Sequence, residues 1–175
     1  MKALHLITVL SITLLFNTVQ AQKCRYEIDE IDSKTEMPIK RTEPIELARV
    51  NNQPLLIKAQ CIGPNKYLKI RYYRYNGFEI RDNEIFEFIF TDRSSIKLKP
   101  RELPKKKSSG GFVTVSSMLI FDLTKDQYAQ LLNKPVGEIK YYVDRGGYVR
   151  DEIRKRFQTD LQYIMQCVLL DTDNL

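Results

Sequence analysis

Apolar and polar side chains alternate with a period of two over much of the chain, which predicts β-strands. The segment "CRYEIDEI" (residues 24–31) shows this alternation first. Later segments are short, rich in β-branched and aromatic residues, and separated by turn sequences such as "GPNK" and "RDN". Strands that follow one another so closely predict an antiparallel meander. The predicted strands are residues 24–31, 39–50, 55–62, 67–75, 78–80, 84–92, 95–99, 112–123 and 138–144.

Two segments in the C-terminal part of the chain show helical patterns instead. Thr124 and Gln127 have the spacing of a capping box, so a helix is expected from there to Asn133. From Tyr148 to Leu169 apolar residues recur every three or four positions, which predicts a second, longer helix. The apolar sides of both helices need a partner, and the sheet offers one. We therefore expect an α+β domain, an antiparallel β-meander sheet with two C-terminal helices packed against it.

Residues 1–21 differ in composition from the rest of the chain. Lys2 is followed by an apolar run from Leu4 to Phe16, and small residues stand at the end of the segment. This pattern is typical of a secretory signal peptide, and the run is shorter than the roughly 20 residues that cross a bilayer. We expect cleavage after Ala21, a secreted or periplasmic location, and a single globular domain over residues 22–175.

The only histidine of the chain, His5, lies within that predicted leader. The processed chain would then have no Ser-His-Asp or Cys-His nucleophile and no His-ligated metal. Glycine-rich phosphate loops, G-x-S-x-G and CxxC motifs are absent from the sequence. We therefore predict no metal and no cofactor, and a non-enzymatic domain. The alternative is a carboxylate-dependent hydrolase that acts on a surface polysaccharide through two acidic side chains.

Three cysteines, Cys24, Cys61 and Cys167, would enter an oxidising compartment, where one disulfide and one free thiol are expected. The sequence alone does not select the pair. A bridge between Cys24 and Cys167 is our preferred hypothesis, because it would tie the N-terminal segment to the last helix. Closing so large a loop is worth about 5 kcal/mol in the chain-entropy model. Cys61 would then be a buried free thiol.

The segment "YLKIRYYRY" (residues 67–75) combines aromatic and basic side chains. On a strand, Leu68, Ile70 and Tyr72 would share one face. An aromatic and basic face can stack on sugar rings or bases and attract an anionic backbone. The other interpretation is an ordinary solvated sheet face, because tyrosine favours strands and cations oppose aggregation at sheet edges. The candidate binding face consists of Tyr67, Lys69, Arg71, Tyr73 and Tyr75.

A second basic segment, "PRELPKKKSSGG" (residues 100–111), has the composition of a mobile surface loop. Lys105, Lys106 and Lys107 are a candidate contact for an anionic ligand, and the alternative is a loop that charge merely keeps solvated. The whole chain has a net charge of +6 but no recognisable nucleic-acid module. An anionic polymer of the cell envelope or another envelope protein is the predicted partner, and no transmembrane helix is expected after signal cleavage.

The order of several segments resembles a loose group of small secreted proteins of unknown function from Bacteroidota-type Gram-negative bacteria. The segments are "CRYEIDEID" after the leader, "TEPIEL", "LTKDQYAQLLNKPVGEIKYYVD" and a terminal helix that contains Cys167. The resemblance implies a periplasmic or extracellular location and cysteines near both ends of the chain. It implies no activity and no site residues.

Overall fold

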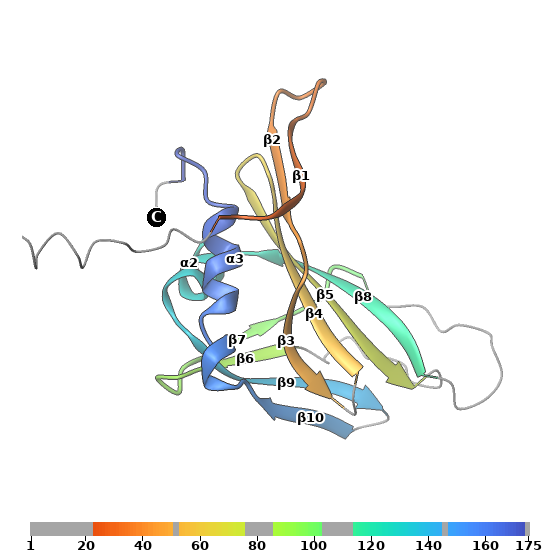
Figure 1. Ribbon diagram of the computed structural model, residues 1–175. Coiled ribbons are helices and arrows are strands. Elements are labelled where there is room, and N and C mark those ends of the chain that lie inside the picture. Colours follow the sequence, from red (N-terminus) through yellow and green to blue (C-terminus); the bar gives the residue numbers. More distant parts are fainter. Residues whose placement is uncertain (1–22, 51–52, 76–85, 103–113, 145–146, 174–175) are drawn as a thin grey trace, which may run out of the picture.

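The described part of the chain folds into two antiparallel sheets and two α-helices, shown in the computed structural model of Figure 1. The structure describes residues 23–50, 53–75, 86–102, 114–144 and 147–173. The predicted leader, the predicted strand at residues 78–80 and residues 103–111 of the predicted basic loop lie outside these ranges. The α+β fold class, with helices packed on antiparallel sheet, is confirmed.

The first sheet has the order β1-β2-β4-β5-β8, and β3 also pairs with β4. Its register places Leu68 opposite both Ala59 of β4 and Phe121 of β8. The inward residues Leu68, Ile70 and Tyr72 are buried, as the period of two predicts. The strands of this sheet are β1 (Tyr26–Ile31), β2 (Pro38–Thr42), β3 (Ile45–Val50), β4 (Gln53–Ile62), β5 (Asn65–Tyr75) and β8 (Thr114–Leu123).

The second sheet has the order β10-β9-β6-β7 and crosses one end of the first in Figure 1. The predicted meander is therefore divided, because β8 pairs with β5 while β6 and β7 join β9. An aromatic cluster joins the two sheets, with the rings of Phe86 and Tyr141 stacked at 4.9 Å and Tyr72 at 5.6 Å from Phe86. The strands are β6 (Phe86–Phe90), β7 (Ser95–Leu98), β9 (Val136–Asp144) and β10 (Gly147–Glu152).

The two helices, α2 (Lys125–Asn133) and α3 (Asp160–Cys167), lie beside each other against the core. The predicted capping box is confirmed: the Gln127 amide donates to Thr124 Oγ1 at 3.2 Å, and the Thr124 amide donates to Gln127 Oε1 at 3.0 Å. None of the helices within the described ranges has the length and apolar character needed to cross a bilayer.

The prediction of one long helix over residues 148–169 is wrong in its first half. Residues 147–152 form β10, a 3-10 turn follows at Lys155–Phe157, and only Asp160–Cys167 is α-helical. Pairing with β9 supplies the backbone of β10 with hydrogen-bond partners, and the Arg150 side chain forms an ion pair with Glu138. Such tertiary pairing outweighs the local helical pattern, because intrinsic helix propensity is a weak preference.

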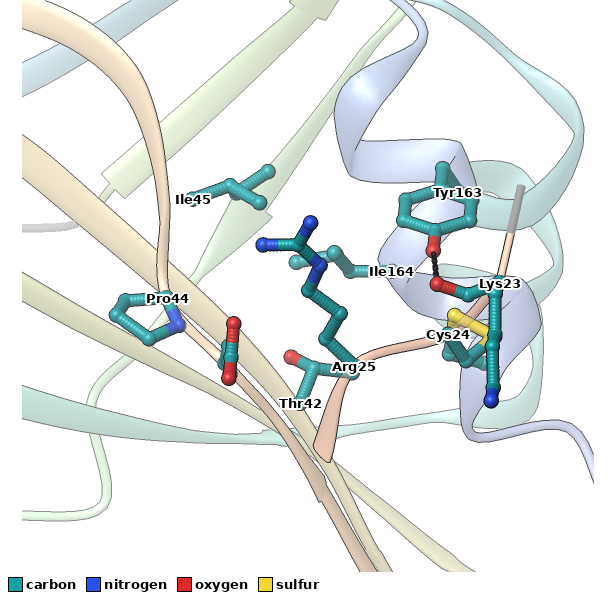
Figure 2. Close-up of a pocket in the computed structure, with 10 residues that line it drawn as sticks. Lys23, Cys24, Arg25, Thr42, Pro44, Ile45, Tyr163 and Ile164 are labelled. Carbon is teal, nitrogen blue, oxygen red and sulfur yellow. Dashed lines mark hydrogen bonds between the residues drawn. A yellow bond between two sulfur atoms is a disulfide. The ribbon is translucent and has the colours of Figure 1, made fainter. Parts of the chain in front are cut away.

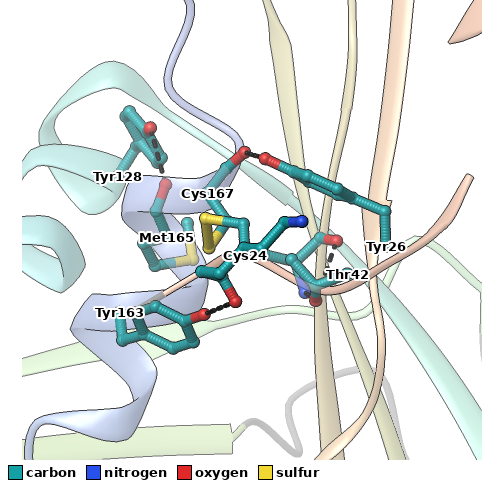
Figure 3. Close-up of a disulfide and its surroundings, with 9 residues drawn as sticks. Cys24, Tyr26, Thr42, Tyr128, Tyr163, Met165 and Cys167 are labelled. Carbon is teal, nitrogen blue, oxygen red and sulfur yellow. Dashed lines mark hydrogen bonds between the residues drawn. A yellow bond between two sulfur atoms is a disulfide. The ribbon is translucent and has the colours of Figure 1, made fainter. Parts of the chain in front are cut away.

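The N-terminal segment is fastened to α3 by three contacts (Figure 3). Cys24 and Cys167 form a disulfide, which confirms the preferred pairing, and Cys61 is a buried free thiol. The Tyr26 hydroxyl donates to the Cys167 carbonyl at 2.8 Å, and the Tyr163 hydroxyl donates to the Lys23 carbonyl at 2.7 Å. These bonds hold β1 and α3 in one arrangement.

The buried Lys66 holds the segment that follows α3 in place. Lys66 on β5 donates to the Val168 carbonyl at 3.0 Å and forms an ion pair with Asp173 at 2.6 Å. Its ammonium also lies 5.5 Å from the centre of the Tyr128 ring. A buried ammonium without such partners would be strongly destabilising, so these contacts fix the C-terminal segment in place.

We predict that Cys24→Ser lowers the free energy of unfolding by about 3–5 kcal/mol. Without the disulfide the unfolded chain gains conformational entropy, which favours unfolding. Urea denaturation followed by circular dichroism measures this change. The matched variant Cys61→Ala keeps the disulfide and should cost only about 1 kcal/mol. Equal losses in the two variants would contradict a stabilising role for the bridge.

Candidate functional site

The strands of the first sheet present alternate side chains on the side that faces away from the core. Residues directly opposite each other on neighbouring strands point to the same face. Lys69 lies between Lys58 of β4 and Ile120 of β8, and Arg71 lies between Leu56 and Met118. We call this surface the outer face. It comprises Glu27, Arg41, Leu56, Lys58, Gln60, Tyr67, Lys69, Arg71, Arg101, Met118, Ile120 and Asp122, with the exposed ion pair Glu46–Arg49 at its margin.

Cations outnumber carboxylates on the outer face. Lys58 forms an ion pair with Glu27, and Arg101 forms one with Asp122. Arg41 donates from Nε to the neutral Gln60 Oε1 at 2.9 Å and forms no ion pair within the described ranges. Lys69 and Arg71 form no ion pair with any residue that the structure describes. The face thus carries a surplus of positive charge.

The surroundings of Lys69 disfavour its charged form. Its side chain is half-buried, and burial is the main cause that lowers its pKa below the usual value. The positive charges of Arg41 and Lys58 lower the pKa of Lys69 further, while Glu27 opposes them. A bound anion would remove this cost, because an opposite charge favours the protonated amine.

Tyr67 lies at one edge of the outer face with the guanidinium of Arg101 over its ring, 5.1 Å from the ring centre. The Arg101 backbone amide donates to the Ile120 carbonyl at 2.7 Å, which holds this residue beside β8. Arg101 therefore covers part of the Tyr67 ring, which was predicted to stack on a ligand. The pair joins a cation to an aromatic ring in one rigid unit.

A small hollow of about 190 Å³ lies in the outer face. Lys58, Lys69 and Arg71 line it together with Glu27, while Leu56, Met118 and Pro44 supply apolar surface. A hollow of this size accommodates one charged group or part of a sugar ring, not a whole drug-sized ligand. The geometry suits recognition of one unit of a longer chain.

The predicted site residues are brought together in part. Tyr67, Lys69 and Arg71 share the outer face, as the period of two requires. The backbones of Tyr73 and Tyr75 continue β5 opposite Ser116 and Thr114, but their side chains lie outside the described residues. The candidate contacts Lys105, Lys106 and Lys107 also lie outside them.

Sequence reasoning missed Arg41, Lys58 and Arg101. Lys58 occupies a polar position of the segment "LLIKAQCI", so its face could be predicted, but its position opposite Lys69 depends on the register of β4 and β5. Arg101 belongs to a segment that was predicted to be loop. Within the described ranges, no three Cys, Asp or Glu side chains gather closely enough to hold a metal ion.

We predict that Arg41→Gln raises the pKa of Lys69 part of the way back toward 10.5, because it removes a nearby positive charge and leaves the burial unchanged. A pH titration of the Lys69 Cε resonance by nuclear magnetic resonance measures the shift. Lys97→Gln, on the second sheet, is the matched control and should leave the titration of Lys69 unchanged. An identical titration in the wild type and Arg41→Gln would contradict the proposed charge cluster.

No protein-family model matches the chain, and neither the search of curated proteins nor that of solved structures found a match. The resemblance to small secreted proteins of Gram-negative bacteria therefore stays a prediction.

Proposed function

We propose that the protein is an exported, non-enzymatic domain that binds an anionic polymer of the cell envelope on its outer face. The observation that carries the proposal is the gathering of Arg41, Lys58, Lys69 and Arg71 around one hollow and its rim on neighbouring strands. Cations gathered on one surface attract repeated negative charges, and each contact contributes modestly.

The form of the surface favours a polymer over a compact ligand. The hollow of the outer face has a volume of only about 190 Å³, so it holds a small part of any ligand at a single point. Neighbouring strands lie about 4.8 Å apart. Lys58 and Lys69 face each other across β4 and β5, and Arg41 and Arg71 occupy the rows on either side of this pair, opposite Gln60 and Leu56. A chain of anionic sugars can follow such rows and place apolar ring faces against Leu56 and Met118.

The carboxylates of the outer face do not support the alternative of a hydrolase. Glycoside hydrolysis needs one protonated carboxyl group as a general acid beside a second, ionised one. Glu27 and Asp122 are both engaged by cations, and the hydrogen bond from Arg101 lowers the pKa of Asp122 below its usual value. Asp122 thus stays ionised and cannot serve as an acid near neutral pH.

Export is part of the proposal because two independent features support it. Residues 1–21 have the pattern of a signal peptide, and the Cys24–Cys167 disulfide is of a kind that persists in oxidising compartments. In such a compartment the outer face would meet the anionic polysaccharides of the envelope.

We predict that the protein binds a carboxylated polysaccharide such as polygalacturonate, and that the double variant Lys69→Gln with Arg71→Gln weakens this binding at least about tenfold. The slope of the logarithm of the affinity against the logarithm of salt concentration should fall by about one for each cation removed. Isothermal titration calorimetry over a salt series measures both quantities.

Neutral dextran and the variant Lys97→Gln are the matched controls. Dextran should not bind, and Lys97→Gln should bind polygalacturonate as the wild type does, because Lys97 lies on the second sheet. Equal weakening by Lys97→Gln would show an unspecific charge effect and would overturn the assignment of the outer face. If the wild-type protein does not bind polygalacturonate but binds an acidic protein tightly, the partner of the outer face is a protein and not a polymer.

A further inference from the structure

A second and larger pocket, of about 660 Å³, lies where the N-terminal segment meets α3 (Figure 2). Residues 23–25 form one wall, the bend at residues 42–45 between β2 and β3 forms another, and Tyr163, Ile164 and Cys167 of α3 form the third. Of these residues only Pro44 also lines the hollow of the outer face. Its volume falls within the range of about 300–1,000 Å³ that is usual for small-molecule sites.

The walls of this pocket are fixed before any ligand arrives. The Cys24–Cys167 disulfide joins the N-terminal wall to α3, and the Tyr163 hydroxyl donates to the Lys23 carbonyl across the same junction. The Glu43 amide donates to the Arg25 carbonyl at 3.0 Å, which joins the N-terminal wall to the bend. A pocket with fixed walls loses little conformational entropy when a ligand binds.

Opposite charges face this pocket without neutralising each other. Arg25 extends between Ile45 and Ile164 in Figure 2. Glu43 also lines the pocket, and neither Arg25 nor Glu43 forms an ion pair with another residue in the part of the chain that the structure describes. Lys23 also lines the pocket, so two cations and one carboxylate border it. A ligand with one negative and one positive group would satisfy both Arg25 and Glu43, whereas a simple anion would leave Glu43 without a partner.

Apolar surface lies beside these charges. Ile164 is buried, Ile45 is half-buried, and the disulfide continues the same wall. Apolar walls with a few convergent polar groups are the usual composition of small-molecule sites, in which the polar groups orient the ligand. The ligand should therefore carry an apolar group next to its two charges.

We propose that this pocket binds a small zwitterion, a free amino acid or dipeptide with an apolar side chain. Its carboxylate pairs with Arg25, its ammonium pairs with Glu43, and its side chain lies against Ile45 and Ile164. This binding is separate from that of the outer face, so either site can operate if the other does not.

The experiment titrates the purified protein, with its disulfide intact, against leucine and leucylleucine and against two capped dipeptides. Leucylleucine amide lacks the carboxylate, and N-acetyl-leucylleucine lacks the ammonium. We expect leucine or leucylleucine to bind and each cap to weaken dipeptide binding about tenfold, as loss of a charged hydrogen bond does. If leucine binds and leucylleucine does not, the ligand is the free amino acid.

Variants then assign each charge to its residue. Arg25→Gln should weaken the binding of free leucylleucine and make its affinity equal to that of the amide. Glu43→Gln should make the affinity of free leucylleucine equal to that of the acetylated form. Lys97→Gln and Glu102→Gln are charge-matched controls on exposed residues and should change nothing. If leucine is the only ligand, leucinamide and N-acetylleucine replace the capped dipeptides in the same comparison.

Two results would overturn the proposal. One is that neither leucine nor leucylleucine binds to the folded protein at millimolar concentration. The other is equal binding of the free and capped ligands, because a site that ignores both charges does not use Arg25 and Glu43. Neither result depends on polygalacturonate, so it leaves the function proposed for the outer face unaffected.

Discussion

The junction between the N-terminal segment and α3 is the constraint on which the rest of the structure depends. The Cys24–Cys167 disulfide and the hydroxyls of Tyr26 and Tyr163 hold this junction, although the two cysteines are separated by 143 residues in sequence. It keeps α3 on the core side of the first sheet, so the outer face stays uncovered by the helices. It also supplies two walls of the larger pocket. The larger pocket therefore depends directly on this covalent attachment.

The core determines which side chains reach the outer face. Leu68, Ile70 and Tyr72 are buried in the core, and this leaves Tyr67, Lys69 and Arg71 on the opposite face of β5. A register slip of one residue would bury Lys69 and Arg71 and expose the apolar set, at a large cost in free energy. The basic character of the outer face thus follows from the burial of its apolar neighbours.

Features that depend on local patterns could be predicted from the sequence. The capping box of Thr124 and Gln127 and the two faces of β5 at residues 67–72 agree with the structure. The pairing of Cys24 with Cys167 also agrees, although it joins residues far apart in sequence. The pairing was a preference and not a deduction, because three cysteines allow three pairs.

Features that depend on partners distant in sequence could not be predicted. The pattern of residues 148–153 suits a helix as well as a strand, and only its pairing with β9 decides between them. The division into two sheets and the approach of Arg41, Lys58 and Arg101 to β5 depend on strand register and order. A list of strands from one sequence fixes neither of these.

Chemical-shift mapping by nuclear magnetic resonance is the most direct test of the claim that the outer face binds an anionic polymer. The backbone amides would be followed while polygalacturonate oligomers are added at physiological salt. We expect the largest shifts in β4 and β5 around Lys58, Lys69 and Arg71, with small shifts in the second sheet. Shifts spread evenly over both sheets, or centred on the second one, would contradict it.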